Sequence, residues 1–333
     1  MRAVVITGNG DFDVLQVQER EDPAMRPAAV RIAVRAAGVN FADVMARMGL
    51  YPDAPKTPSV VGYEVSGEVT EVADGVTAVA VGDRVMAGTN FGGYASEVVV
   101  PAADAIPLPD RLSFEQGAAI PVNYATAWAG LVGYGSLREG ERVLLHAAGG
   151  GVGIAATQIA KRNGAEVWGT ASPAKHDAIR CFGVDHAVDY RKAGWERGLP
   201  SFDLIMDALG GRSFNRSYKL LRPGGRLVAF GASSVVGGST RNLLKAAPEA
   251  LPMLRGFSLI DQMSQSKAVI GLNMKTLWDD RGTLTPWINP LAALIEDGTV
   301  DPVVYEAVPF DQAAEAHRIL TERRNVGKVV LVP

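Results

Sequence analysis

A glycine-rich run near the middle of the chain has the residue types and spacing to hold a phosphate group. It extends from His146 to Ala156 as His-Ala-Ala-Gly-Gly-Gly-Val-Gly-Ile-Ala-Ala. In the pattern Gly151-x-Gly153-x-x-Ala156, the first glycine permits a tight turn, the second lets a pyrophosphate approach, and the small third residue lets a helix pack on a strand. The run follows an apolar strand and opens a helix, so it predicts a dinucleotide site at the backbone of Gly150, Gly151 and Val152.

The next strand indicates which dinucleotide binds. An NAD site usually has an acidic residue at the end of this strand, where it holds the ribose 2′-hydroxyl. Here the strand at 166–172 ends without a carboxylate, and the polar residues that follow are Ser172, Lys175 and His176. A hydroxyl and an ammonium suit a 2′-phosphate, so we expect NADPH. The alternative is that Ser172 caps a helix and Lys175 is a solvated charge.

The elements around this run alternate between strands and helices. Before Pro121 the chain has short β-type runs separated by Gly, Pro and Asp, which predict a compact β-barrel or sandwich. After Pro121, helices separate apolar strands, which predicts a doubly wound parallel sheet of the α/β class. The expected strands of this sheet lie at 142–146, 166–170, 188–190, 202–207, 226–230 and 268–273.

The composition excludes several classes of function. The 333 residues carry a net charge of −3, which gives no electrostatic case for binding nucleic acid. Cys181 is the only cysteine, so the chain forms no internal disulfide and no cysteine-rich zinc cluster. No apolar run is long enough to span a membrane. We therefore expect a soluble protein, and the cysteine content fits the reducing cytoplasm.

Several motifs together resemble the medium-chain dehydrogenase/reductase superfamily over essentially the whole chain, and the zinc-independent quinone oxidoreductase branch fits best. They lie at 37–43, 49–52, 82–85, 92–95, 147–153 and 325–332. Other segments look closer still to the synaptic-vesicle membrane protein subgroup, namely 40–47, 121–126, 169–176 and 241–244.

This resemblance implies a GroES-like, partly open β-barrel catalytic domain made from both chain ends. We expect this domain at 1–122 and 262–333, an NADP-binding Rossmann domain at 123–261, and the active site between them. Zinc-dependent relatives have Cys and His where this chain has Asn40 and Tyr63, both poor zinc ligands, so no metal is expected. Asp43 and Glu64 remain at their family positions and are expected to anchor the barrel.

The resemblance also implies the residues that line the active site. Asn40 and Tyr51 would lie beside the substrate and donate hydrogen bonds, with Tyr63 as a weaker candidate; their alternative roles are a turn cap for Asn40 and a core aromatic for Tyr51. Tyr190 would pack near the adenine. The residues expected along the nicotinamide and its ribose are Asn40, Thr126, Phe230, Gly231, Ala232, Leu272 and Asn325.

Without zinc to polarise a carbonyl, the hydride needs an acceptor that is already electrophilic, such as a small hydrophobic quinone or an α,β-unsaturated carbonyl. Two alternatives remain open: a lipid-transfer or binding protein with little turnover, and an enoyl-thioester reductase.

The apolar edge strand at 268–273 and the family both favour a homodimer. The amphipathic segment Leu243 to Leu254 is expected to form an apolar wall over the substrate cleft, with interdomain or dimer packing and membrane contact as alternatives.

Overall fold

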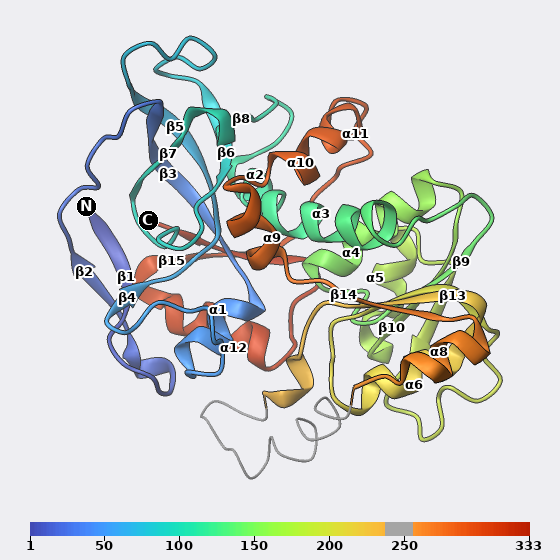
Figure 1. Cartoon of the computed structure of the whole chain (residues 1–333). Helices are drawn as coiled ribbons and strands as arrows, with labels where there is room; N and C mark the ends of the chain where they lie inside the picture. Colours follow the sequence, from blue (N-terminus) through green and yellow to red (C-terminus); the bar gives the residue numbers. More distant parts are fainter. Residues whose placement is uncertain (237–255) are drawn as a thin grey trace.

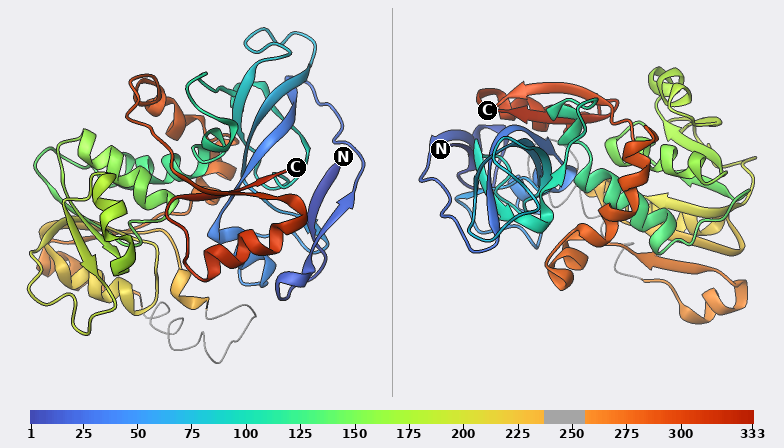
Figure 2. Two further views of the ribbon diagram at one scale, coloured as in Figure 1. Left: turned by 180° about the vertical axis from the view of Figure 1, so that it is seen from behind. Right: turned by 90° about the horizontal axis from the view of Figure 1, so that it is seen from above.

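The computed structural model of this chain describes residues 1–236 and 256–333, which form two lobes (Figure 1). One lobe contains both termini, and its blue and cyan strands lie beside the red C-terminal strands. The view from above in Figure 2 separates this lobe from the second, which is green and yellow. The segment Leu243 to Leu254 lies outside the described residues, so the apolar wall expected there stays a prediction.

The terminal lobe is built mainly from short antiparallel strands. A seven-stranded sheet has the order β15-β16-β3-β5-β6-β8, with β7 also paired to β3, and a smaller sheet has the order β2-β1-β4. The strands are β1 Arg2–Ile6, β2 Leu15–Glu19, β3 Ala29–Val39, β4 Ser59–Val60, β5 Glu64–Val72, β6 Arg84–Gly88, β7 Glu97–Pro101, β8 Ile106–Pro107, β15 Val304–Pro309 and β16 Lys328–Val332. Since β16 pairs with β3, the two chain ends share one sheet, as expected for the GroES-like domain.

The second lobe is a parallel sheet with the order β11-β10-β9-β12-β13-β14. Every neighbouring pair is parallel, and in chain order this is the 3-2-1-4-5-6 arrangement of a Rossmann fold. The strands are β9 Arg142–Leu145, β10 Glu166–Ala171, β11 His186–Asp189, β12 Phe202–Asp207, β13 Leu221–Ala229 and β14 Ala268–Gly271. The predicted fold class is therefore confirmed.

Helices surround these sheets and join them. The described α-helices are α1 Phe41–Arg47, α2 Phe114–Gly117, α3 Pro121–Trp128, α4 Gly151–Arg162, α5 His176–Cys181, α6 Arg212–Leu220, α8 Leu259–Gln265, α9 Met274–Arg281, α10 Thr285–Ile288, α11 Ala292–Glu296 and α12 Ala313–Thr321. None of these described helices has the length and apolar character to cross a bilayer.

The centre of the Rossmann sheet follows from its sequence. All six residues of β12 are buried, because a central parallel strand is covered on both faces. At the adjacent turn, a Cβ on Gly153 would lie 2.4 Å from the carbonyl oxygen of Ala147, so only glycine permits this close approach. Ala156 is 1% exposed, which confirms that the small third residue of the motif packs inward.

We propose domain limits of 1–122 and 262–333 for the barrel domain and 123–261 for the Rossmann domain. One strand does not follow this division, and it places the end of the Rossmann sheet later than residue 261. β14 lies beyond residue 262 but pairs in parallel with β13 of the Rossmann sheet. The chain therefore completes the nucleotide sheet before it returns to the barrel.

Candidate active site

Asn40 lies where β3 ends and α1 begins, and its side chain is held by two charged residues. Its backbone N–H donates to Oδ2 of Asp43 at 2.8 Å, which fixes the start of the helix. Its side-chain Nδ2 donates to Oε1 of Glu64 at 3.0 Å, while Oδ1 accepts from Nζ of Lys328 at 2.7 Å. Asn40 is thus at the helix cap, as the alternative expected, but its amide is directed to the ion pair.

Glu64 and Lys328 form an ion pair in the interior. Glu64 begins β5 and is 0% exposed, Lys328 begins β16 and is 4% exposed, and Nζ lies 2.5 Å from Oε1. The second carboxylate oxygen accepts from the backbone N–H of Val122 in α3 at 2.7 Å. A Cβ on Gly38 would lie 2.6 Å from this carboxylate, so glycine in β3 makes room for the pair. Buried charges need such partners because desolvation penalises each ion alone.

Asp43 connects the Asn40 turn with the loop that carries Tyr63. Oδ1 accepts from the backbone N–H of Gly62 at 3.1 Å, and Oδ2 accepts from the hydroxyl of Tyr94 at 3.0 Å. The side chain is fully buried, and this desolvation raises the pKa of Asp43 to about 7, although its hydrogen bonds act in the opposite direction. The expectation that this carboxylate anchors the barrel is confirmed.

Tyr51 and Tyr63 meet edge to face, with ring centroids 6.4 Å apart. Tyr63 also packs on Phe91 at 4.8 Å. Burial raises the pKa of Tyr51 to about 12 and raises the pKa of Tyr63 as well. The hydroxyl oxygen of Tyr63 is buried and has no hydrogen-bond partner among the described residues. Both phenols therefore keep their protons at neutral pH and can donate them to a hydrogen-bond acceptor.

The predicted cofactor residues lie mostly where the parallel strands end. Since all six strands run in one direction, their carboxyl ends share an edge, which is where open α/β sheets bind ligands. The residues that follow these strands are Gly150, Gly151 and Val152 after β9; Ser172, Lys175 and His176 after β10; Tyr190 after β11; Phe230, Gly231 and Ala232 after β13; and Leu272 after β14. Thr126 is buried in α3.

The C-terminal segment brings Asn325 to the same edge. The backbone N–H of Gly327 donates to the carbonyl oxygen of Gly149 at 2.8 Å. Nζ of Lys175 donates to the carbonyl oxygens of Arg323 at 2.8 Å and Asn325 at 2.5 Å. Lys175 is therefore paired with the chain rather than solvated, and these two contacts leave the third N–H of its ammonium group for a phosphate.

The start of α4 fits a dinucleotide phosphate. Gly150 is the cap residue, and the first N–H groups of a helix have no partners within it. These groups and the helix dipole attract an anion. Ser172 occupies a cap position, but its hydroxyl makes no capping hydrogen bond, which leaves this hydroxyl free for another acceptor.

The residues around Asn40 do not fit a catalytic metal ion. The ammonium group of Lys328 lies against Glu64, and its positive charge would repel a cation there. Asp43 uses both carboxylate oxygens on N–H and O–H donors. Across residues 1–236 and 256–333, no three His, Cys, Asp or Glu side chains are grouped to hold a metal. This donor set favours zinc independence, which stays a prediction.

A second buried polar cluster lies beneath the glycine turn. Oδ2 of Asp207 accepts from the hydroxyls of Ser213 and Ser217, both at 2.7 Å, and Ser217 also contacts Nε2 of His146 at 3.0 Å. Oδ1 of Asp207 accepts from the backbone N–H of Leu209 at 2.8 Å, so Asp207 caps the turn that follows β12. The cluster is buried, so it supports the strand ends and presents no nucleophile to solvent.

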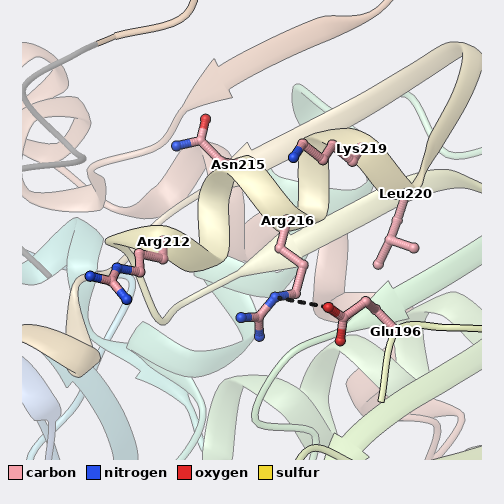
Figure 3. Close-up of a pocket in the computed structure, with 6 residues that line it drawn as sticks. All are labelled: Glu196, Arg212, Asn215, Arg216, Lys219 and Leu220. Carbon is pink, nitrogen blue, oxygen red and sulfur yellow. Dashed lines mark ion pairs between the residues drawn. The ribbon is translucent and has the colours of Figure 1, made fainter. Parts of the chain in front are cut away.

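A separate hollow of about 250 Å³ lies along α6, and Figure 3 draws the side chains that line it. Arg212, Asn215, Arg216 and Lys219 line it, and Arg216 lies 3.9 Å from Glu196. None of the sequence-predicted site residues lines this hollow, so its presence does not contribute to the site around Asn40.

Sequence reasoning missed Lys328 as a site residue, and it missed the contact of Tyr94 with Asp43. The available signal for Lys328 was a single lysine that begins an otherwise apolar strand, Lys-Val-Val-Leu-Val. Its partner Glu64 is 264 positions away, and neither residue indicates the other in the sequence.

Comparisons with known proteins agree with this architecture. The profile described as zinc-binding dehydrogenase matches residues 182–331, and that of the alcohol dehydrogenase GroES-like domain matches residues 26–110. The synaptic vesicle membrane protein VAT-1 homolog of Rattus norvegicus is 36% identical over 341 aligned residues, which cover 100% of this chain and 84% of the relative.

Two solved structures extend the comparison. The human synaptic vesicle membrane protein VAT-1 homolog-like protein has 31% identity and a TM-score of 0.85, covering 100% of this chain and 98% of its own. The Escherichia coli quinone oxidoreductase complexed with NADPH has 30% identity and a TM-score of 0.85, covering 100% of both chains.

Proposed function

Because the chain belongs to the medium-chain dehydrogenase/reductase superfamily, we propose that it is an NADPH-dependent, zinc-independent oxidoreductase that reduces a quinone or an α,β-unsaturated carbonyl. The superfamily membership supports an oxidoreductase. The acceptor class and the choice of NADPH are inferences from the residues of the site.

The observation that carries the proposal is the ion pair of Lys328 and Glu64 beside Asn40. It places an ammonium group where a Lewis acid would otherwise act. An alcohol–aldehyde couple would then lack its usual electrophile. Quinones and enones need less assistance, because their electrons delocalise onto oxygen during reduction. The protein has only to orient the acceptor and donate a hydrogen bond to that oxygen.

NADPH, when bound, supplies the hydride. The backbone N–H groups at the start of α4 bind its pyrophosphate, and residues after the other strands lie along the nucleotide. Asn40, Tyr51 and Tyr63 are the proposed donors to the acceptor oxygen. The high pKa values of the two tyrosines keep their O–H groups intact in this role. The partly exposed ring of Phe91, which packs on the buried Tyr63, offers a flat acceptor a place to pack.

The residues after β10 support NADPH over NADH. Lys175 brings an ammonium group to the strand end where an NAD site has a carboxylate, and the Ser172 hydroxyl has no capping partner. A homodimer is part of the proposal, because β14 has no partner on its outer edge among the described strands. The cytoplasmic location stays a prediction from the single cysteine.

One assay panel tests the function. Purified protein is mixed with NADPH and, separately, with small quinones, alkenals and enoyl thioesters, and NADPH consumption is followed. We expect turnover with quinones or alkenals, unchanged by chelator, in protein without stoichiometric zinc. Turnover confined to enoyl thioesters, no turnover at all, or about one zinc per chain lost together with activity would each refute the proposal.

A further inference from the structure

The Asn40 side chain lies between a positive and a negative charge. Nζ of Lys328 donates to its Oδ1 at 2.7 Å, and its Nδ2 donates to Oε1 of Glu64 at 3.0 Å. Turning the amide over would bring its NH2 group to the ammonium and its oxygen to the carboxylate. Both contacts would then be repulsive, so only one of the two amide orientations is compatible with the pair.

The pair that sets this orientation is itself fixed. Glu64 and Lys328 are 0% and 4% exposed, so water does not screen their charges. The backbone N–H of Val122 holds the second oxygen of Glu64. The two residues begin different strands, β5 and β16, each of which is paired in the same sheet. The amide is consequently held by two charges that lie on paired strands of the barrel sheet.

One hydrogen of the Asn40 amide remains for another partner. Glu64 engages Nδ2, and the only other described contact of this atom is the Gly38 carbonyl oxygen at 3.5 Å, a long distance for a hydrogen bond. Asn40 is half-buried, so this edge of the side chain is not sealed from ligands.

We propose that Lys328, paired with Glu64, is a positioning residue that locks the Asn40 amide so that its remaining N–H donates to the acceptor oxygen. This inference rests on the proposed function. Lys328 acts through Asn40 and does not itself contact the acceptor.

A mutant cycle tests the coupling. The variant K328M/E64Q removes both charges together and leaves no uncompensated buried ion. We expect its kcat to fall at least tenfold, while the acceptor KM and the NADPH dissociation constant stay within threefold. In the N40A background the same double change should have no further effect on kcat, because Lys328 acts only through Asn40. If K328M/E64Q lowers kcat by the same factor in the N40A background as in the native protein, the proposal is overturned.

A second readout does not depend on turnover. With asparagine selectively labelled with 15N, the Asn40 side-chain resonance is identified by its absence in N40A. The locked amide should give two well-separated hydrogen signals, and K328M/E64Q should bring them together or broaden them. An Asn40 resonance that is unchanged in K328M/E64Q would overturn the lock.

Controls separate folding and function from positioning. K161M/D185N removes an exposed lysine–aspartate pair with a 2.8 Å contact, and it should leave kcat and the resonance unchanged. If K328M/E64Q does not fold, K328Q/E64Q keeps hydrogen-bonding groups and is measured in the same way. A native protein that reduces no acceptor refutes the proposed function, whereas normal native turnover with an unaffected K328M/E64Q refutes only the positioning role.

Discussion

The hydroxyl group of Tyr94 lies 3.0 Å from Oδ2 of Asp43 and donates a hydrogen bond to that carboxylate. On the other side of this hydroxyl, Nε2 of His317 lies 3.4 Å away. Tyr94 and His317 are fully buried. These two contacts link α1, which follows Asn40, to α12 near the C-terminus. They bring an acid, Asp43, and a base, His317, to the same buried hydroxyl group.

Asp43 should make stability fall with rising pH. Its folded-state pKa of about 7 lies above the ordinary value of 3.8, so the folded protein binds this proton more tightly than the unfolded chain. The Asp43 contribution is therefore favourable at low pH and is lost between about pH 4 and 7, at up to roughly 1.4 kcal/mol per pH unit. The difference in unfolding free energy between native protein and D43N, measured with urea at several pH values, should fall across this range. A constant difference would contradict the pKa shift.

His317 should have the opposite effect. Burial lowers its pKa from 6.5 to about 3, so its contribution is present above pH 6.5 and is lost as the pH falls toward 3. Between about pH 4 and 6.5 the effects of His317 and Asp43 oppose each other, and the native protein should show a shallow pH dependence. H317Q should unmask the Asp43 slope in urea unfolding, whereas H186Q, on the exposed His186, should not. Equal pH profiles for the two variants would contradict this assignment.

The Rossmann half of the fold could be predicted because its signals are local. The strand predicted at 202–207 has the same bounds as β12, and the glycine run begins α4 as expected. A continuous apolar strand and a glycine turn each reveal themselves within a few residues. By contrast, we predicted the barrel only as a series of short β-type runs without individual bounds, and no helix was predicted at α8 to α10. Short or mixed sequences such as those of β1, β2 and β4 carry weak periodicity.

The candidate site was predictable as a set of residues but not as a network. Resemblance pointed to Asn40 and Tyr63, yet the sequence does not show that Lys328 holds the Asn40 amide. Nor does it show that Lys175 contacts the segment at Asn325, which lies 150 positions away. Such contacts depend on how β16 and the C-terminal segment return to the first lobe, and hydrophobic periodicity does not specify which polar partners meet there.

Replacing Lys175 should separate the two dinucleotides. K175A removes the proposed charged partner of the 2′-phosphate, and a hydrogen bond to a charged group contributes about 1.5–3 kcal/mol, or roughly 10- to 100-fold in affinity. NADPH binding measured by fluorescence should weaken by this factor, while NADH binding changes little. K161A is the matched control, because Lys161 pairs with Asp185 at the surface.

The NADH measurement also controls for the structural contacts of Lys175. Its ammonium holds the carbonyl oxygens of Arg323 and Asn325, so K175A also loosens the C-terminal segment. A loosened C-terminal segment alone would weaken the binding of NADPH and NADH to the same extent. Equal losses for NADPH and NADH, or equal affinities in the native protein, would therefore contradict recognition of the 2′-phosphate.

The outer edge of β14 should form a dimer. β14 pairs only with β13 among the described strands, and the nearby helix α8 exposes Leu259, Ile260 and Met263 by 69%, 77% and 73%. The backbone N–H of Leu272 donates to Ala229 on the inner side, so by alternation the N–H of Val269 points outward. V269P should remove this outer donor and spare the inner pairing.

Light scattering at micromolar concentration should give the native protein twice the chain mass of 35.2 kDa, and V269P a lower mass. L259S/I260S tests the helix independently, since it leaves the strand backbone intact and removes exposed apolar surface. If the strand edge forms the interface and α8 lies beside it, both variants should weaken the dimer, and V269P should have the larger effect. A native protein at the monomer mass would eliminate this assembly, and a dimer that survives V269P would place its interface elsewhere.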